Sequence, residues 1–359
     1  MNSLRLPHRP TRPAPLRAWS AGLRVGPVVI AHRGASGYRP EHTLAAFALA
    51  IRLGADFIEP DLVLTRDGVL IVRHDNEISA TTDVADRPEF AGRRTTREVD
   101  GRTLTGWFTE DFTLAEIKTL RARERLPWLR PTCHDGRFEV ATFQEVLDLA
   151  RSASRRFGRT IGVYPETKHP TYFSSLGLSH EEPLVRALRS NGLDRVSAPV
   201  LVQSMETGNL ARLADLTRVG LVQLLAAEGA PYDLAGLGTT YADLATPAGL
   251  AGIADYAVGI GVAKDLVVPR SEDGRLLAPT TLVADAHERG LFVHGYTFRA
   301  ENAFLPAGFR GIGSAAEQGD GAAECATFLE LGLDGMFADH PDVAVAGRAR
   351  AARRAALAA

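Results

Sequence analysis

Short apolar segments alternate with segments of helical periodicity along most of this chain. The apolar segments are rich in Val, Ile and Leu and span residues 28–31, 57–64, 69–73, 161–164, 200–202, 220–224, 256–259, 291–294 and 335–337. Helical periodicity marks residues 43–53, 143–151, 183–191, 282–289 and 322–331, and the segments end at Gly54, Gly192, Gly290 and Gly332 where C-terminal caps belong. Repeated β–α units predict a mostly parallel sheet, and about eight of them fit a (β/α)8 barrel better than an open sheet.

Length and composition indicate a folded protein but do not choose between one domain and two. The 359 residues could form one large barrel or two modest domains. Hydrophobic residues make up 45% and charged residues 23%, which excludes wholesale disorder and a collagen-like chain. The formal net charge of −2 argues against a nucleic-acid partner. No apolar run approaches the ~18 residues of a transmembrane segment, and two cysteines are too few for a disulfide framework or a Cys-rich zinc site.

The charge is distributed unevenly along the chain. Residues 1–40 contain seven Arg and no acidic residue, residues 342–359 contain four Arg and one Asp, and residues 41–341 therefore carry a formal charge of −12. We interpret residues 1–26 as a disordered basic leader or an expression remnant, residues 27–345 as the barrel domain, and residues 346–359 as an Arg/Ala-rich C-terminal tail. The leader shows no apolar signal core, so the sequence leaves the compartment open.

One interval breaks the alternation. Residues 75–144 are rich in Asp, Arg, Thr and Pro and show little strand character, with one helix-like stretch at residues 113–121. An ordinary connection spans ~4–6 residues. We therefore expect residues 76–140 to be an inserted excursion near one mouth of the barrel, which we call the excursion.

A His-Arg pair follows the first apolar segment. Residues at the C-terminal ends of barrel strands face the active-site mouth, so His32 and Arg33 are expected there. Gly34 and Gly37 would let the backbone approach a ligand, and the forked donors of arginine suit phosphate oxygens. A single histidine at a strand end is more often structural, so His32 is a candidate only together with other groups.

Two carboxylates occur at i and i+2 in the next apolar segment. The period of a strand places Glu59 and Asp61 on the same face. A cation between them would relieve their repulsion, so a metal is the simplest hypothesis. The alternative is a pair of solvated carboxylates at a strand end. Pro60 cannot donate a ladder hydrogen bond and is compatible with both interpretations.

Two later segments are also expected to place polar side chains at the barrel mouth. The Asp67-Gly68 dipeptide predicts a hairpin turn, after which the chain brings His74 back toward the mouth, where it could face His32. Glu166 and Lys168 are again spaced i and i+2. The chain has only three lysines against 38 arginines, a weak sign that a compact ammonium is required at Lys168.

Together these pieces resemble the glycerophosphodiester phosphodiesterase family, in its long form with an insertion after the second histidine. The resemblance covers roughly residues 28–345. The matching segments are residues 32–36, 40–43, 59–61, 74–75, 166–168, 293–297 and 334–341. Thr167 replaces a common aliphatic residue, and Gly295 stands where proline is frequent, but neither departure involves a proposed ligand.

The resemblance implies a TIM barrel that cleaves glycerophosphodiesters to glycerol 3-phosphate and an alcohol. By the same resemblance, the acid/base pair is His32 and His74, and the phosphate-binding pair is Arg33 and Lys168. The ligands of one divalent cation would be Glu59, Asp61 and Glu166, and Tyr296 would be an aromatic residue that lines the pocket. Gln203 and Ser204 are weaker candidates for the lining. Members with a long excursion often act outside the cytoplasm, which favours a periplasmic or secreted location.

The chemistry of these residue types agrees with that assignment. Three carboxylates make an all-oxygen site that favours Ca²⁺ or Mg²⁺ over Zn²⁺. Two histidines with an ordinary pKa near 6.5 suit proton transfer near neutrality. The family mechanism uses the neighbouring glycerol hydroxyl as an internal nucleophile and passes through a cyclic phosphate. Which histidine is the base, which alcohol leaves and the oligomeric state are not decided by the sequence.

Two other classes of protein remain as alternatives. A lysophospholipase D-type phosphodiesterase could use the same barrel and the same residues. A non-catalytic metal- or phosphate-binding barrel would be favoured if a histidine or a carboxylate of the set were missing, and none is missing. A metal-dependent amidohydrolase is disfavoured because no His-x-His pair follows the first apolar segment.

Overall fold

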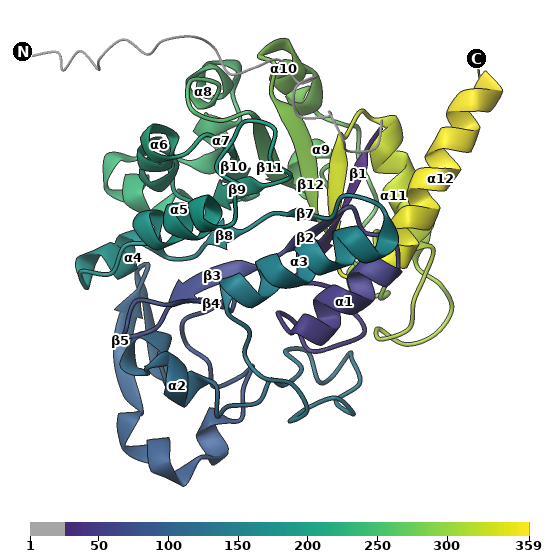
Figure 1. The fold of residues 1–359 in the computed structure, drawn as a ribbon. Coiled ribbons are helices and arrows are strands. Elements are labelled where there is room, and N and C mark those ends of the chain that lie inside the picture. The colour runs from purple at the N-terminus through teal and green to yellow at the C-terminus, as the bar shows by residue number, and fades with distance from the viewer. Residues whose placement is uncertain (1–25, 359) are drawn as a thin grey trace, which may run out of the picture.

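Parallel strands form a closed barrel at the centre of the molecule (Figure 1). The structure is a computed structural model that describes residues 26–358, so the predicted leader lies almost entirely outside the described residues. One barrel strand is interrupted at Pro60, which separates β2 from β3, and the next is interrupted at Tyr164 and Pro165, which separate β7 from β8. β2 pairs with β7, β3 with β8 and β8 with β9, all in parallel, and these pairs close the ring. The predicted TIM barrel is confirmed.

The described strands and helices follow the expected alternation. The barrel strands are β1 (Val28–His32), β2 (Phe57–Glu59) with β3 (Asp61–Leu64), β7 (Gly162–Val163) with β8 (Glu166–Thr167), β9 (Leu201–Ser204), β10 (Gly220–Leu225), β11 (Gly259–Ala263), β12 (Phe292–Phe298) and β13 (Gly335–Ala338). The helices outside the excursion are α1 (Leu44–Arg52), α3 (Phe143–Phe157), α4 (Pro170–Ser175), α5 (Glu181–Ser190), α6 (Thr207–Leu216), α7 (Tyr241–Leu244), α8 (Pro247–Ile253), α9 (Lys264–Val267), α10 (Leu282–Glu288), α11 (Gly321–Glu330) and α12 (Pro341–Ala358).

Local sequence signals account for several of these boundaries. Thr43 caps α1 by accepting a hydrogen bond from the backbone N–H of Ala46, and Thr142 and Glu145 form a capping box at α3. The four glycines predicted to follow helices all have positive φ angles, between 69° and 99°. The Asp67-Gly68 turn joins β3 to the antiparallel strand β4 (Leu70–Val72), as the sequence predicts.

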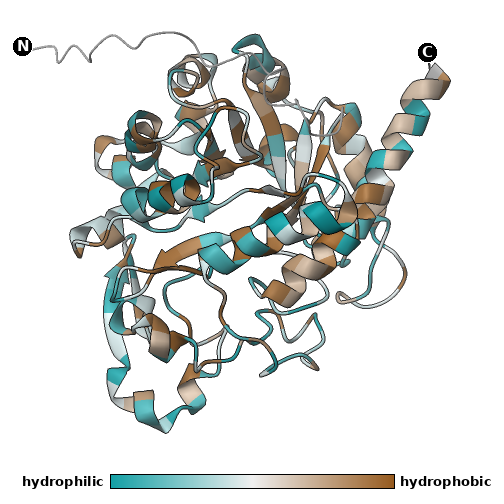
Figure 2. Cartoon of the chain, viewed as in Figure 1, coloured by the Kyte–Doolittle hydropathy of each residue, from teal (hydrophilic) through white to brown (hydrophobic). Residues whose placement is uncertain are grey.

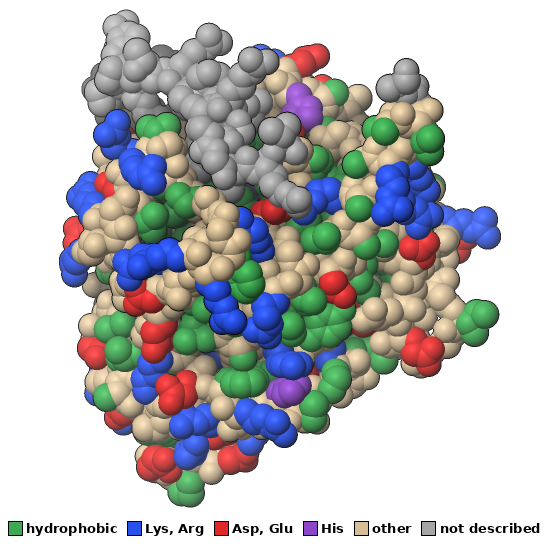
Figure 3. Space-filling view, turned by 45° about the vertical axis from the view of Figure 1, so that its right-hand side comes forward, with side chains coloured by type: hydrophobic (Ala, Val, Ile, Leu, Met, Phe, Trp, Pro, Cys, Tyr) green, Lys and Arg blue, Asp and Glu red, His purple; other side chains and the backbone are tan. Residues whose placement is uncertain are grey.

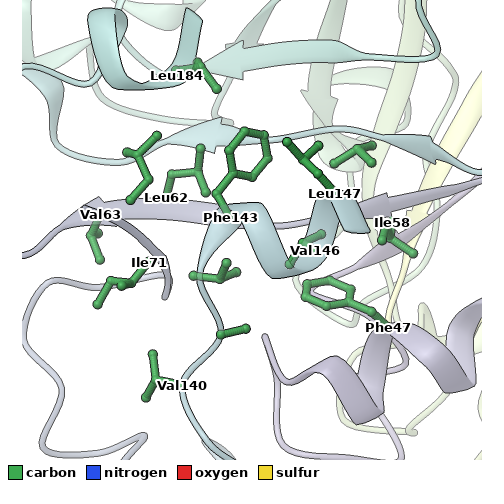
Figure 4. Close-up of a cluster of buried hydrophobic side chains, with 14 of the residues drawn as sticks. Phe47, Ile58, Leu62, Val63, Ile71, Val140, Phe143, Val146, Leu147 and Leu184 are labelled. Atoms are coloured by element: carbon green, nitrogen blue, oxygen red, sulfur yellow. The ribbon is translucent and has the colours of Figure 1, made fainter. Parts of the chain in front are cut away.

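Three groups of buried side chains form the core. One group fills the barrel interior: Ile30, Phe57, Tyr164, Leu201, Val222, Phe292 and Phe337. The two others lie between the barrel and its helices, and one of them extends into the excursion, where it includes Phe90 and Phe108. Figure 4 shows Phe143 and Val146 of α3 directed toward the strand that carries Ile58 and Leu62. The buried residues of α3 are Phe143, Val146, Leu147, Ala150 and Ala153, and hydrophilic residues occupy much of the rest of this helix (Figure 2). No described helix is long and apolar enough to span a membrane.

The excursion contains a hairpin that the sequence analysis did not predict. Strands β5 (Thr95–Val99) and β6 (Arg102–Gly106) pair across a turn at Asp100 and Gly101, whose φ angles are 47° and 74°. The expectation of little strand character is wrong here because most of the hairpin side chains are exposed and polar, so no apolar alternation marks it. The excursion also holds α2 (Leu114–Ile117) and the 3-10 turns η2 (Val84–Asp86), η3 (Pro88–Arg93) and η4 (Thr109–Asp111). It lies beside β3 and β4, at the bottom of Figure 1.

Two boundaries near the C-terminal half differ from the sequence-based ones. The strand expected at residues 256–259 begins only at Gly259. The backbone N–H groups of Tyr256 and Ala257 donate to the carbonyl of Ile253, so these two residues still belong to the turn that ends the preceding helix. Two glycines in β11 weaken its strand signal. Helix α12 continues across the predicted end of the barrel domain at residue 345 and includes most of the predicted tail. Arg348 of this helix donates to the carbonyl of Pro27 at 3.1 Å. Basic side chains gather along α12, at the upper right of Figure 3.

Candidate active site

The barrel brings the predicted site residues together at the C-terminal ends of its strands. Seven of them line one cavity of about 590 Å³, namely His32, Arg33, Glu59, His74, Glu166, Lys168 and Tyr296. The eighth, Asp61, is 1% exposed and lies among the carboxylates described next. The ends of β1, β2, β4, β8 and β12 therefore meet at a single mouth, as expected for a TIM barrel.

Three buried carboxylates form a cluster at this mouth. Glu59, Asp61 and Glu166 each offer an oxygen within 4.8 Å of the others, and all three residues are at most 7% exposed. Glu59 accepts hydrogen bonds from the backbone N–H of Arg33 at 2.8 Å and from the amide of Gln203 at 3.3 Å. Asp61 lies 2.8 Å from Nε2 of His42, and Glu166 accepts from Lys168 at 2.8 Å, so each member of the trio is held by a protein group.

The pKa shifts and the hydrogen bonding of the three carboxylates indicate whether they could hold a cation. Burial, and then the charges of Asp61 and Glu166, raise the pKa of Glu59 well above its usual value. Burial also raises the pKa of Glu166 to about 7, even though Lys168 acts in the opposite direction. The Oδ1 atom of Asp61 is buried and has no hydrogen-bond partner. An unpaired oxygen in a repelling all-carboxylate set fits a hard divalent cation, so these residues could hold one.

Each of the two histidines is oriented by a carboxylate. The Nδ1 atom of His32 lies 2.6 Å from Oδ1 of Asp339, and the Nδ1 atom of His74 lies 2.7 Å from Oδ1 of Asp75. If Nδ1 carries the proton and donates it to the carboxylate, Nε2 of each ring is the basic nitrogen. Nε2 of His74 lies 3.1 Å from the Nζ atom of Lys168.

Burial keeps both histidines neutral near pH 7 in the absence of other ligands. Burial, followed by the charge of Arg33, lowers the pKa of His32 to about 4. The same two causes, with Lys168, lower the pKa of His74 to about 3. A phosphodiester anion would offset the nearby positive charges and shift both values back toward the range useful for proton transfer.

The two predicted phosphate ligands are already fixed by acidic partners. Arg33 donates from Nη1 to Glu41 at 2.9 Å, and Lys168 donates from Nζ to Glu166 at 2.8 Å. Burial acts to lower the pKa of Lys168, but Glu166 and Asp61 together outweigh it and raise the pKa, so the lysine stays charged. Tyr296 donates its hydroxyl to the carbonyl of Leu225 at 2.9 Å, so it is chiefly its ring that is available to a ligand.

Several residues of this site were not predicted as functional. Asp75, Glu41 and Asp339 lie inside the quoted motifs, and their motif positions are the signal that could have indicated them. Arg125 and Arg130 belong to the excursion, where no motif marks them. Only the fold reveals that these two arginines contact carboxylates of the site, Arg125 at Asp75 and Arg130 at Asp339.

A second cavity of about 660 Å³ adjoins the first. Both cavities are lined by Glu166, Lys168 and Met205, so they meet beside the predicted phosphate ligand. The hairpin of the excursion contributes Val99 and Asp100 to the second cavity. The space beside Lys168 therefore continues from the first cavity into the second.

The sequence also matches a family of enzymes over nearly its whole length. The model of the glycerophosphoryl diester phosphodiesterase family matches residues 32–343. The chain belongs to this family. The resemblance inferred from the motifs and the predicted enzyme class are thereby confirmed.

Individual members of the family cover most of the chain as well. A glycerophosphodiester phosphodiesterase of Arabidopsis thaliana is 38% identical over 326 residues, which is 87% of this chain and 83% of that protein. A glycerophosphodiester phosphodiesterase of Haemophilus influenzae is 30% identical over 341 residues, covering 89% and 88% of the two chains. The matches therefore extend over more than four fifths of this chain and of both relatives.

Solved structures of family members share the fold. A phosphodiesterase from Silicibacter pomeroyi, described as putative, superposes with a TM-score of 0.64 at 21% identity and covers 93% of this chain and 97% of its own. A phosphodiesterase from Oleispira antarctica, solved in complex with sn-glycerol-3-phosphate, has a TM-score of 0.59 at 19% identity, with coverage of 90% and 96%.

Proposed function

We propose that this chain hydrolyses glycerophosphodiesters to glycerol 3-phosphate and an alcohol, and that the reaction requires one divalent cation, Ca²⁺ or Mg²⁺. One observation carries the proposal: a buried carboxylate trio, two carboxylate-bound histidines and the positively charged side chains of Arg33 and Lys168 lie at a single barrel mouth. A non-catalytic metal- or phosphate-binding barrel would not need two carboxylate-bound histidines beside the trio.

Each residue has a role that follows from its position. Glu59, Asp61 and Glu166 hold the cation, which when bound supplies positive charge to stabilise the developing negative charge on the phosphoryl oxygens. Arg33 and Lys168 bind oxygens of the phosphate, and the ring of Tyr296 lines the pocket.

The two histidines move the protons. One histidine takes the proton of the attacking hydroxyl through Nε2, and the other gives a proton to the leaving alkoxide. The attacking group is the glycerol hydroxyl next to the ester, which gains from its high effective concentration and forms a cyclic phosphate. Water then opens that ring, and the histidines exchange their roles.

The charge balance supports a requirement for the cation. Arg33 and Lys168 together carry +2, and the carboxylate trio carries −3 when fully ionised. A divalent cation favours ionisation of all three carboxylates and leaves a local charge of +1 that a phosphodiester anion neutralises, whereas the ionised trio without the cation would leave −1 and repel the anion. Binding of substrate and the chemical step should therefore both depend on metal.

The decisive experiment measures glycerol 3-phosphate release from glycerophosphocholine with a coupled assay. We expect activity that is lost with a chelator and restored by Ca²⁺ or Mg²⁺, and we expect the chelator also to weaken substrate binding in a direct titration. Absence of release under every metal condition would overturn the proposal. Unchanged substrate affinity without metal would overturn the proposed role of the cation in binding.

The same assay separates the proposal from a lysophospholipase D-type activity. The second cavity provides room for a group larger than a small alcohol on one side of the phosphate. Faster turnover of glycerophosphocholine than of lysophosphatidylcholine supports a glycerophosphodiester substrate. The reverse preference would assign the chain to the lysophospholipase D type.

A further inference from the structure

A short segment of the excursion reaches the carboxylates that orient both proposed catalytic histidines. Arg125 donates from Nη1 to Oδ2 of Asp75 at 2.7 Å. Five residues later, Arg130 donates from Nη2 to Oδ2 of Asp339 at 2.6 Å. In each case the other oxygen of the same carboxylate contacts Nδ1 of a histidine.

The two contacts have the same form. Each aspartate bridges an arginine of the excursion and a histidine of the barrel mouth, so that both carboxylate oxygens are engaged. A carboxylate held at one oxygen can rotate about its side-chain bonds, whereas one held at both oxygens fixes the plane and direction of the imidazole that it binds. The arginines therefore act on the rings through Asp75 and Asp339.

The arginines are themselves fixed at further points. Arg125 also donates from Nη2 to Glu41 at 2.7 Å, and the other oxygen of Glu41 accepts from Arg33. Ion pairs therefore connect Arg33, a proposed phosphate ligand, to Asp75 through Glu41 and Arg125, and Asp75 is hydrogen-bonded to His74. Arg130, whose side chain is 6% exposed, donates from Nε to Glu301 at 2.6 Å.

The backbone of this segment is tied to the rest of the excursion. The N–H of Ala122 donates to the carbonyl of Phe138 at 2.8 Å, and the N–H of Arg123 donates to the carbonyl of Thr81 at 2.9 Å. The N–H of Arg130 closes a turn onto the carbonyl of Leu126 at 2.9 Å. The arginines are therefore presented by an anchored segment and not by a free loop.

We propose that residues 121–130 form a positioning strap, in which Arg125 and Arg130 orient the imidazole rings of His74 and His32 through Asp75 and Asp339. Neither arginine lines the cavity that holds the proposed phosphate site, so both are positioning residues. The inference rests on the proposed function, and it gives the excursion a catalytic purpose.

The two ends of the strap are not equivalent. Asp339 also accepts a hydrogen bond from Arg299 of the barrel at 2.9 Å, so it keeps one arginine if Arg130 is replaced. Among the described residues, Arg125 is the arginine that Asp75 contacts. Arg125 is also the more exposed of the two, at 25% against 6% for the side chain. Its replacement is therefore the cleaner test.

The test compares Arg125→Met, Arg125→Lys and Arg123→Met with the wild type. Arg123 lies in the same strap but pairs with the exposed Asp86, so it is the matched control. We expect Arg125→Met to lower kcat about tenfold, equivalent to about 1.4 kcal/mol, with KM within about twofold. Arg125→Lys should recover part of kcat, and millimolar guanidinium should partly rescue Arg125→Met.

A second readout does not need activity. In protein labelled with ¹⁵N-histidine, the Nδ1–H signal of His74, assigned with a His74→Gln variant, should shift or broaden in Arg125→Met while that of His32 stays unchanged. Arg130→Lys should leave the His74 signal unchanged and shift that of His32 by less, because Arg299 still holds Asp339.

The outcomes separate this inference from the proposed function. Wild-type kcat and an unchanged His74 signal in Arg125→Met would overturn the strap, and so would an equal loss in Arg123→Met. A rise in KM at constant kcat would make Arg125 a binding residue and would also overturn it. An inactive wild type would overturn the proposed function, and the histidine signals would then decide the strap alone.

Discussion

Two aspartates far apart in the sequence give the proposed acid/base pair its geometry. Asp75 follows His74 directly, while Asp339 lies 307 residues after His32. Burial acts to raise the pKa of Asp339, but Arg299 and Arg130 keep it well below its usual value. Asp339 thus stays a charged acceptor and holds the His32 ring without taking its proton.

Replacing either histidine tests this arrangement at the scale of the residue. We expect His32→Ala and His74→Ala to lower kcat by at least about 100-fold, because general acid–base catalysis contributes about that much or more. Glycerol 3-phosphate release measures the effect, and thermal unfolding should show an intact fold. Wild-type-like turnover in either variant would contradict the assignment.

A buried ion pair connects two helices at the scale of the element. Lys264 of α9 donates to Glu324 of α11 at 2.6 Å, and their side chains are 8% and 0% exposed. Arg270 approaches the same carboxylate oxygen at 3.5 Å. The pair therefore joins the end of β11 to a helix that follows β12.

Removing one partner of this pair should destabilise the fold strongly. We expect Glu324→Ala to reduce the free energy of unfolding by about 3–5 kcal/mol, because the charge of Lys264 would remain buried without its partner. Glu330 of the same helix pairs with Arg354 at the surface, and Glu330→Ala should cost less than about 1 kcal/mol. Urea unfolding of both variants gives the comparison, and equal losses would show that the buried pair has no special weight.

Buried titratable groups, among them a histidine with a lowered pKa and a glutamate with a raised pKa, make the stability of the whole molecule depend on pH. His294 is 4% exposed, stacks on Phe292 with 4.3 Å between ring centroids, and burial lowers its pKa to about 4. Between about pH 6.5 and 4 the unfolded chain therefore binds a proton there that the folded chain does not. Stability contributed by neutral His294 is present above pH 6.5 and is lost as the pH falls.

Glu206 shows the opposite behaviour. Burial raises its pKa to about 7, so the folded chain holds a proton at pH values where the unfolded carboxylate has none. Its ionisation destabilises the fold near and above neutrality, and this cost disappears as the pH falls toward the unfolded pKa.

Two variants measured from pH 7.5 to 4.5 separate these contributions. Relative to wild type, His294→Phe should gain about 1.4 kcal/mol of stability per pH unit as the pH falls below 6.5. Glu206→Gln should lose relative stability over the same range. Urea unfolding at each pH measures both, and parallel slopes for wild type and variants would contradict the assigned pKa directions.

The sequence by itself determined the repeating units and the local pairs of the site. The alternation of apolar and helical segments, the capping glycines and the Asp67-Gly68 turn depend on a few neighbouring residues, so they can be seen without the fold. The i and i+2 spacing placed Glu59 with Asp61, and Glu166 with Lys168, for the same reason.

Only the tertiary structure decided how distant groups meet. Closing the barrel brings Asp339 to His32, and the path of the excursion brings Arg125 and Arg130 to the two histidine-bound aspartates. The polar hairpin β5–β6 has no apolar alternation that could announce it. Periodicity and turn chemistry are local, whereas buried ion pairs exist only after the chain has folded and excluded water from them.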